Sequence, residues 1–532
     1  MKTLIGGLCM TLALSAASSD LRVLEAAQRS DAQAVRSLLV EKADVNAAAG
    51  DGMTALHWAA YKDDLETAQL LLQAGASVKA ATRNGAMTPL ILASKNGNAV
   101  MIAALLKAGA DANTATTDGM TALMAAAVSG QVEAAKVLVD HGANVNAREA
   151  SHGQTALMFA AAENRGAMIS FLAAHAADLI ATTGVIRLEA AKLDDDGNPI
   201  PVKKGDETVT GGNSFMGGMT ALLFAARDGN LDAVRALLEA KAGVNQVSGG
   251  ERSSPLVIAI ANGHYEVGQL LLDHGANPNI ANIDGLTPLY AAINMQYAPV
   301  SWAPNPLTGQ EKITHLDLMK ALLEHGADPN AKLNKKLWFS PSSHNQLWVN
   351  PVGATPFWRA AQATDVAAMH LLVAHGADPR IATNSGTTPL MVASGLGWAG
   401  NFSQTNADTW MDSVKYCVDL GLDVNAADAQ GYTPLMGAAW RGNNDIIEFL
   451  ASKGAKLDAR NKKGWSVTDM ANGPALRSSV PMTHPETIAF LVKLGAPALT
   501  QIQGESILGS TRKAPYGGDK KAAPDKPPAA RQ

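Results

Sequence analysis

The sequence predicts an all-α solenoid, in which about twelve short helix pairs stack side by side. A frame of the form T-[AP]-L-x-x-A-[AS], followed about ten residues later by [LI]-L-x-x-G-A-[DN]-x-N, recurs along the 532-residue chain, mostly at intervals of 33 or 34 residues. Alanine is abundant and aromatic residues make up only 5 %, which suits thin, closely spaced layers better than one deep core. No apolar run reaches about 18 residues, which excludes a bundle of membrane-spanning helices.

The copies of this frame run almost the whole length of the chain. Ten are clear, and they begin at Thr54, Thr88, Thr121, Thr155, Thr220, Ser254, Thr287, Thr355, Thr388 and Thr433. Two degenerate copies begin at Leu21 and Ser466, which brings the total to twelve. The first copy is rich in charged residues, as a terminal repeat that faces water requires.

Within one copy, each residue type fits one part of a helix pair. The hydroxyl of Thr54 can cap the first helix, and Pro89 in the next copy stands where the first turn of a helix tolerates proline. Ala59 and Ala60 let neighbouring helices approach closely. Gly75 follows the second helix, at a position where a left-handed backbone would cost a side chain about 1 kcal/mol. We therefore expect helix–turn–helix units that stack through small side chains.

This repeated frame resembles the ankyrin repeat family over about residues 20–500. The resemblance implies a curved solenoid whose repeats each carry a projecting β-turn finger, and a chain that binds proteins rather than catalysing a reaction. In the family, the finger tips and the two residues that end the first helix face the partner. Carried over by alignment, the helix-end positions are Tyr61, Lys62, Lys95, Asn96, Glu163, Arg227, Asp228, Trp440 and Arg441. Tyr61 and Trp440 are favoured, because large aromatic side chains are typical of interface hot spots.

A long insertion at residues 181–217 interrupts the array in a finger region. The copies on either side lack the glycine that ends the second helix, since Ala176 and Lys241 occupy its place. We expect locally distorted stacking there. Two interpretations remain open, a hinge between two sub-arrays and a plain surface loop. Residues 194–198 also allow a loose calcium loop or a solvated turn, although the EF-hand pattern does not fit.

A second group of insertions covers residues 295–312, 335–353 and 396–410, and it is rich in tryptophan. Six of the nine tryptophans lie in or beside it: Trp302, Trp338, Trp348, Trp358, Trp398 and Trp410. One interpretation is that long loops need apolar anchors to fold onto the array. The other is an aromatic-walled site for a sugar or a peptide, built from Trp302, Trp338, Trp348, Trp398 and Trp410.

Signatures of catalysis and of metal binding are scarce, so we expect no enzyme, no cofactor and no metal. The run Gly395–Gly400 spells G-x-G-x-x-G, but it lies in an insertion and does not join a strand to a helix. Histidines recur where second helices end, at His141, His175, His274, His325 and His375. Interaction with unpaired helix carbonyls explains these histidines better than a metal does. Cys417 lies on an apolar helix and is expected in the core.

The chain start has the features of a secretory signal peptide over residues 1–17, with a basic Lys2, an apolar stretch and small residues before Ser18. Removal of this segment would take Cys9 away and leave Cys417 as the one thiol, so no internal disulfide is expected. Export points to a bacterial periplasmic or secreted protein. Residues 501–532 form a Pro- and Lys-rich tail that we expect to be disordered.

The predicted organisation is therefore a signal peptide at 1–17, repeats at 18–180, an insertion at 181–217, further repeats at 218–500 and a tail at 501–532. The net charge of −5 lies in the body rather than the basic tail, which argues against nucleic acid as a partner. We expect a monomeric, exported scaffold that binds one or more proteins through its concave face and finger loops. The alternative is a protein that binds a sugar or peptide through the Trp-rich insertions.

Overall fold

The computed structural model describes residues 20–188, 192–193, 199–200, 214–298, 308–335, 337, 349–398, 405–473 and 483–500. Within these ranges the chain forms 24 α-helices, which follow one another as twelve consecutive pairs. The all-α repeat fold is thereby confirmed. The predicted signal peptide, the tail and residues 194–198 lie outside the described ranges.

The first helices of the pairs follow the threonine or serine of each frame, where one is present. They are α1 (Arg22–Gln28), α3 (Ala55–Tyr61), α5 (Pro89–Asn96), α7 (Ala122–Ser129), α9 (Ala156–Ala162), α11 (Ala221–Arg227), α13 (Pro255–Ala261), α15 (Pro288–Gln296), α17 (Pro356–Ala363), α19 (Pro389–Ala393), α21 (Pro434–Arg441) and α23 (Val467–Ala471).

The second helices are mostly nine residues long. They are α2 (Ala32–Val40), α4 (Leu65–Gln73), α6 (Ala99–Lys107), α8 (Val132–Asp140), α10 (Gly166–Ala174), α12 (Leu231–Glu239), α14 (Tyr265–Asp273), α16 (His315–Glu324), α18 (Val366–Ala374), α20 (Trp410–Asp419), α22 (Asn444–Ser452) and α24 (Pro485–Lys493). Two 3-10 turns and four short strands complete the described elements: η1 (Thr308–Gln310), η2 (Ala407–Thr409), β1 (Val185–Leu188), β2 (Lys192–Leu193), β3 (Pro199–Ile200) and β4 (Ser214–Gly217).

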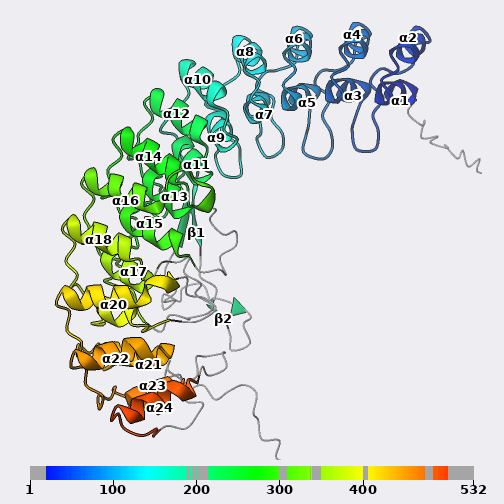
Figure 1. The fold of residues 1–532 in the computed structure, drawn as a ribbon. Coiled ribbons are helices and arrows are strands. Elements are labelled where there is room, and N and C mark those ends of the chain that lie inside the picture. Colours follow the sequence, from blue (N-terminus) through cyan, green and yellow to red (C-terminus); the bar gives the residue numbers. More distant parts are fainter. Residues whose placement is uncertain are drawn as a thin grey trace, which may run out of the picture. The chain divides into compact units, whose positions relative to one another are not determined.

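The chain divides into two units, the first with α1 to α16 and the second with α17 to α24. Inside the first unit, each first helix packs on the first helix of the next pair, as for α3 on α5 and α5 on α7. Figure 1 shows the finger loops of α1 to α8 projecting on the side of the first helices. The core is built mainly of alanine and leucine from these helices.

The insertion at 181–217 does not separate the two units. Helices α9 and α11 pack together across it, as do α10 and α12. The side-chain amide of Asn230 donates to the carbonyl oxygens of Ala161 and Ala162, at 2.9 and 2.8 Å. Strands β1 and β4 pair antiparallel at the base of the insertion. The repeats on both sides of the insertion therefore belong to one unit, and the distorted stacking expected there is not observed.

The repeats beside the insertion keep the usual turn without glycine. Ala176 and Lys241 adopt φ angles of 61° and 69°, in the left-handed region, and Lys42 does so in the first repeat. Gly75 has φ of 87° at the same place, and nothing lies within 4 Å of the position that a Cβ would take there. The cost of a side chain at this turn is therefore backbone strain rather than a clash, which explains why stacking survives.

Most first helices begin at a threonine or serine whose hydroxyl accepts from a backbone N–H of the first turn, as Thr88 does, and in one repeat the cap also reaches the next repeat. The backbone N–H of Thr54 donates to Nδ1 of His57 at 3.1 Å, so the proton lies on Nε2, which donates to the carbonyl oxygen of Met87 at 3.0 Å. Burial lowers the pKa of His57 and keeps it neutral. Trp358 stands at the same place in its repeat, and its indole N–H donates to the carbonyl oxygen of Thr387 at 3.0 Å.

An asparagine in the finger of one repeat forms two hydrogen bonds with the next repeat. The side-chain amide of Asn113 donates to the carbonyl oxygen of Gly142 at 2.9 Å, and its oxygen accepts from the backbone N–H of Asn144 at 2.8 Å. The same pair of bonds is made by Asn46, Asn146, Asn245, Asn279, Asn330 and Asn425. We call this pair of bonds the asparagine bridge.

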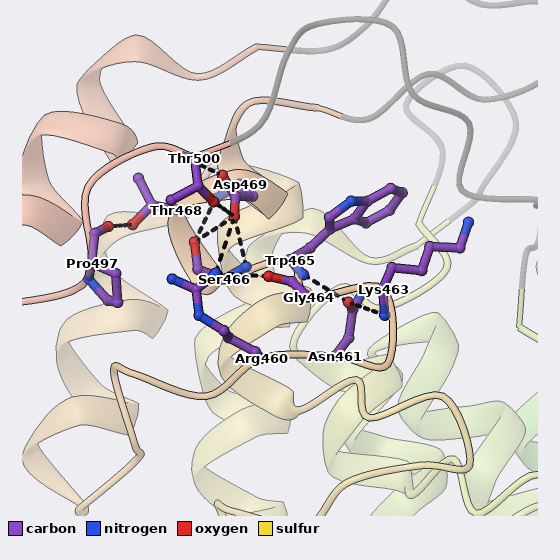
Figure 2. Close-up of polar contacts among 10 residues, drawn as sticks. All are labelled: Arg460, Asn461, Lys463, Gly464, Trp465, Ser466, Thr468, Asp469, Pro497 and Thr500. Atoms are coloured by element: carbon purple, nitrogen blue, oxygen red, sulfur yellow. Dashed lines mark hydrogen bonds and ion pairs between the residues drawn. The ribbon is translucent and has the colours of Figure 1, made fainter.

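The last repeat is closed by a buried carboxylate (Figure 2). Asp469 is fully buried and accepts from the backbone N–H and hydroxyl of Ser466, both at 2.8 Å. It also accepts from the backbone N–H and hydroxyl of Thr500, at 2.8 and 2.7 Å. The hydroxyl of Thr468 donates to the carbonyl oxygen of Pro497 at 2.7 Å. These bonds fix the segment after α24 against α23.

The asparagine bridge generates a first prediction. Asn113→Ala should lower the free energy of unfolding by about 1 kcal/mol, because two backbone groups of the next repeat lose their partner. Lys79 occupies the bridge position one repeat earlier, and in the described residues it makes no such bridge. Lys79→Asn should therefore raise stability by a similar amount. Urea denaturation followed by helical circular dichroism, with hydrogen exchange of the peptide containing Asn144, measures both changes. Equal urea midpoints for all three proteins would contradict the prediction.

The carboxylate of Asp469 generates a second prediction. Burial alone would raise the pKa of Asp469, but the hydrogen bonds from Ser466 and Thr500 outweigh burial and hold that pKa below its usual value. A depressed pKa stabilises the fold above the unfolded-state pKa of about 3.9, and this contribution is lost as the pH falls through the lower, folded-state value.

Asp469→Asn should therefore cost about 1–3 kcal/mol at pH 7 and lose less further stability than the wild type between pH 5 and pH 2. Urea midpoints of both proteins across this pH range test the prediction. The other carboxylates are common to both proteins, so parallel pH profiles would show that Asp469 does not contribute in this way.

Candidate functional site

The helix-end positions of the first unit are exposed, as expected for a binding face. Tyr61 is 56 % exposed at the end of α3, and its ring meets Trp58 edge-on, with centroids 5.9 Å apart. Lys62, Lys95 and Glu163 are exposed as well. The Nζ of Lys62 donates to the carbonyl oxygen of Gln28 at 2.6 Å, so this lysine also caps the first helix of the preceding repeat.

Two further sequence-predicted positions have structural partners. The side-chain amide of Asn96 donates to the carbonyl oxygen of Tyr61 at 2.8 Å and to Oδ1 of Asp63 at 3.1 Å. Arg227 and Asp228 form an ion pair with each other at 2.7 Å, and both are partly exposed. Asn96 therefore joins two repeats, whereas Arg227 and Asp228 satisfy each other at the surface and add little stability there.

The exposure expected at Trp440 and Arg441 is wrong. Trp440 is only 2 % exposed and Arg441 only 6 %. The indole N–H of Trp440 donates to the carbonyl oxygen of Trp398 at 2.7 Å, and the Nε2 of His484 lies 3.1 Å from the carbonyl oxygen of Trp440. The physical reason is that Trp398, Thr405 and Trp410, which follow α19, contact the end of α21.

The tryptophans of this insertion meet Arg441. The rings of Trp398 and Trp410 lie edge to face, with centroids 6.1 Å apart. The guanidinium carbon of Arg441 lies 3.3 Å from the ring centroid of Trp410 and 5.1 Å from that of Trp398. The hydroxyl oxygen of Thr405 accepts from the indole N–H of Trp410 at 3.1 Å and from Nη2 of Arg441 at 3.3 Å. We call Trp398, Thr405, Trp410 and Arg441 the tryptophan–arginine cluster.

Of the five tryptophans of the predicted ligand site, Trp398 and Trp410 are among the described residues. Trp302, Trp338 and Trp348 lie outside the described residues. Trp358 is buried and takes the place that His57 has in its own repeat, so it holds neighbouring repeats together. Trp358 therefore joins two repeats rather than anchoring an insertion loop, and the structure brings Trp398 and Trp410 together.

Sequence reasoning missed a set of exposed apolar side chains in, and directly before, the insertion at 181–217. Ile180, Val185, Ile186 and Met216 are each between 50 and 66 % exposed, and we call them the ribbon cluster. Ile186 pairs with Met216 across β1 and β4. One residue in the sequence could have indicated this surface. Ile180 stands where other repeats have the bridge asparagine, so a large apolar side chain replaces a polar one there.

The recurring histidines and the cysteine have structural roles. The Nδ1 atoms of His141, His175, His274, His325 and His375 lie 2.8–2.9 Å from the carbonyl oxygen four residues earlier, which confirms the predicted contact with helix carbonyls. Cys417 is fully buried, and burial raises the pKa of its thiol, which confirms its core position. In the described part of the chain, no three His, Cys, Asp or Glu side chains gather as a metal ligand set.

None of the helices in the described ranges is both long and apolar enough to cross a bilayer.

Comparison with known proteins identifies the repeat. A family model described as ankyrin repeats, in three copies, matches residues 23–116, 101–183, 206–282, 222–333 and 360–461. Ankyrin repeat and SOCS box protein 16 from Homo sapiens is 28 % identical over 268 residues, which is 50 % of each chain.

Two other relatives match shorter stretches. E3 ubiquitin-protein ligase XBAT33 from Arabidopsis thaliana is 31 % identical over 196 residues, which is 36 % of each chain. Alpha-latrocrustotoxin-Lt1a from Latrodectus tredecimguttatus is 26 % identical over 224 residues, which is 42 % of this chain and 13 % of the toxin. The chain spans half or less of the length of these three relatives.

The burial difference between two helix ends generates a third prediction. Trp440→Ala should cost about 3–5 kcal/mol of unfolding free energy, because it empties a packed position. Tyr61→Ala should change stability by less than about 0.5 kcal/mol, because most of this side chain is in water. Urea denaturation of both variants measures the two changes in unfolding free energy. An equal decrease in the two variants would contradict the prediction, because it would show that Tyr61 contributes to the core as Trp440 does.

Proposed function

Because the chain belongs to the ankyrin-repeat family, we propose that it is an exported scaffold that binds one or more proteins through the first helices and finger loops of its first unit. Repeats of this family generally mediate protein–protein interaction. The relatives named for ligase or toxin activity match this chain over 36 % and 13 % of their own lengths, so the proposal takes only the interaction module from them.

The observation that best supports the proposal is the exposed apolar surface on the fingers, beside exposed aromatic and charged helix ends. The ribbon cluster presents four large apolar side chains to water, and Tyr61 presents an aromatic ring. Exposed large apolar side chains that lie side by side, as Ile186 and Met216 do across β1 and β4, are typical of an interaction site, and tyrosine is enriched in interface hot spots. Rigid repeats keep such a surface in place, so binding costs little ordering.

Export is the second part of the proposal. It is based on the signal-like residues 1–17 and on the lone Cys417, which together describe a chain that is stable outside the cell without a disulfide. We place the chain in the periplasm or the medium as a non-enzymatic monomer with protein partners. The acidic body disfavours nucleic acid.

Site-specific photocrosslinking in the native host tests both parts. A benzophenone side chain placed at Tyr61 or at Ile186 should crosslink the same partner, and the product should be recovered from the exported fraction with a chain that begins at Ser18. Val100 on α6 is the matched control, because it is 60 % exposed but lies on a second helix, away from the fingers.

Crosslinks from position 100 alone would place the interface on the second helices and contradict the proposed surface. A product found only inside the cell with residues 1–17 still attached would contradict export.

A further inference from the structure

The tryptophan–arginine cluster contains a buried positive charge that nothing described neutralises. Arg441 is only 6 % exposed, and its Nε–H is buried without a hydrogen-bond partner. The one polar contact of its guanidinium in the described part of the chain is with Thr405, at 3.3 Å. Burying a charge without a partner is costly, and buried arginines are normally paired.

The other buried arginine of the second unit has the expected partners. Arg359 is 7 % exposed, and its Nη2 donates to the carbonyl oxygen of Tyr297 at 3.0 Å. The carboxylate of Asp365 lies close enough for its charge and that of Arg359 to act on the same Tyr297 hydroxyl. Arg441 has no such carboxylate. Burial alone lowers the pKa of Arg441 to about 9, which still leaves it charged at neutral pH.

Asp408, the one acidic residue of the insertion at 396–410, is exposed, and its charge does not act on Arg441. Residues 338–348, 399–404 and 474–482 contain neither aspartate nor glutamate. The balancing charge must therefore come from further away in the chain or from a separate molecule.

The atoms around Arg441 fit one class of anion. Trp398 and Trp410 are half-buried, so part of each side chain reaches solvent. Among the described residues, no second cation acts on Arg441, so a singly charged anion would balance it. A carboxylate has the planar shape and two oxygens that the N–H groups of a guanidinium recognise, and aromatic walls favour an organic group attached to it.

We propose that Trp398, Trp410 and Arg441 form a binding site for an organic carboxylate. This site lies in the second unit and does not depend on the protein-binding surface of the first. The carboxylate can come from a separate small molecule or peptide, or from the chain itself, since the tail carries Glu505, Asp519 and Asp525.

The test uses the full-length chain and benzoate as the probe, with the uncharged benzamide as its matched control. At constant ionic strength, benzoate should change the tryptophan fluorescence with saturation and raise the thermal midpoint, whereas benzamide should do neither. Arg441→Met keeps an apolar stem of similar length and removes the charge. This variant should be at least as thermostable as the wild type and should bind benzoate about tenfold more weakly or not at all.

Three controls keep the result decisive. Arg227→Met removes an exposed arginine and should leave the benzoate response unchanged. Trp410→Phe should weaken the response even if Arg441→Met fails to fold. Sulfate should give no comparable response, because it is tetrahedral and doubly charged and has no aromatic ring to pack against the tryptophans.

The source of the natural carboxylate is tested with the full chain in which Glu505, Asp519 and Asp525 are changed to their amides. Tighter benzoate binding by this variant would identify the tail as the occupant, and unchanged binding would indicate a separate molecule. An equal response to benzoate and benzamide, an equal response to sulfate, or a response that persists in Arg441→Met would overturn the proposal.

Discussion

The hydrogen bonds that join each repeat to the next are the interaction on which the rest of this structure depends. Helices of five to ten residues are too short to be stable alone, and in a solenoid each pair contacts only its neighbours. The carbonyl groups left unpaired at helix ends must therefore be satisfied by an adjacent repeat. Asn113 does this at the end of a second helix, and Asn96 and Arg165 do it at the ends of first helices. Side chains that would otherwise be free to bind a partner are thereby committed to stacking.

Most of the fold could be predicted from the sequence because its determinants are local and repeated. The threonine before each first helix, the small residues on it and the turn after the second helix lie within one repeat, so Thr88 or Gly75 can be interpreted without knowing anything distant. The covering of Trp440 could not be predicted in this way. Its position in the repeat is that of an exposed helix end, and only the fold of the residues after α19 buries it. The ribbon cluster was missed for a related reason, since the repeat pattern says nothing about strands formed inside an insertion.

The insertions therefore change the surface of the two units in opposite ways. In the first unit the helix ends stay open and an insertion adds exposed apolar side chains beside the fingers. In the second unit an insertion closes over the end of α21, and the same repeat positions become part of the interior. A binding surface deduced from repeat positions alone would treat Tyr61 and Trp440 as equivalent. Their burial differs, since Tyr61 is exposed and Trp440 is buried. Tyr61 is therefore available to a partner protein, whereas Trp440 contributes to packing.

Packing does not explain why the interior of the second unit contains a charge. The stem and ring contacts of Arg441 could be made by an apolar side chain of similar length, which would fill the same space against Trp398 and Trp410 without desolvating a guanidinium. A single long hydrogen bond to Thr405 recovers little of that desolvation. The faces of Trp398 and Trp410 offset part of the cost of burying this cation, and a carboxylate bound in the cluster would supply the balancing charge. The same low-polarity surroundings that make the unpaired guanidinium costly would strengthen its attraction for that carboxylate.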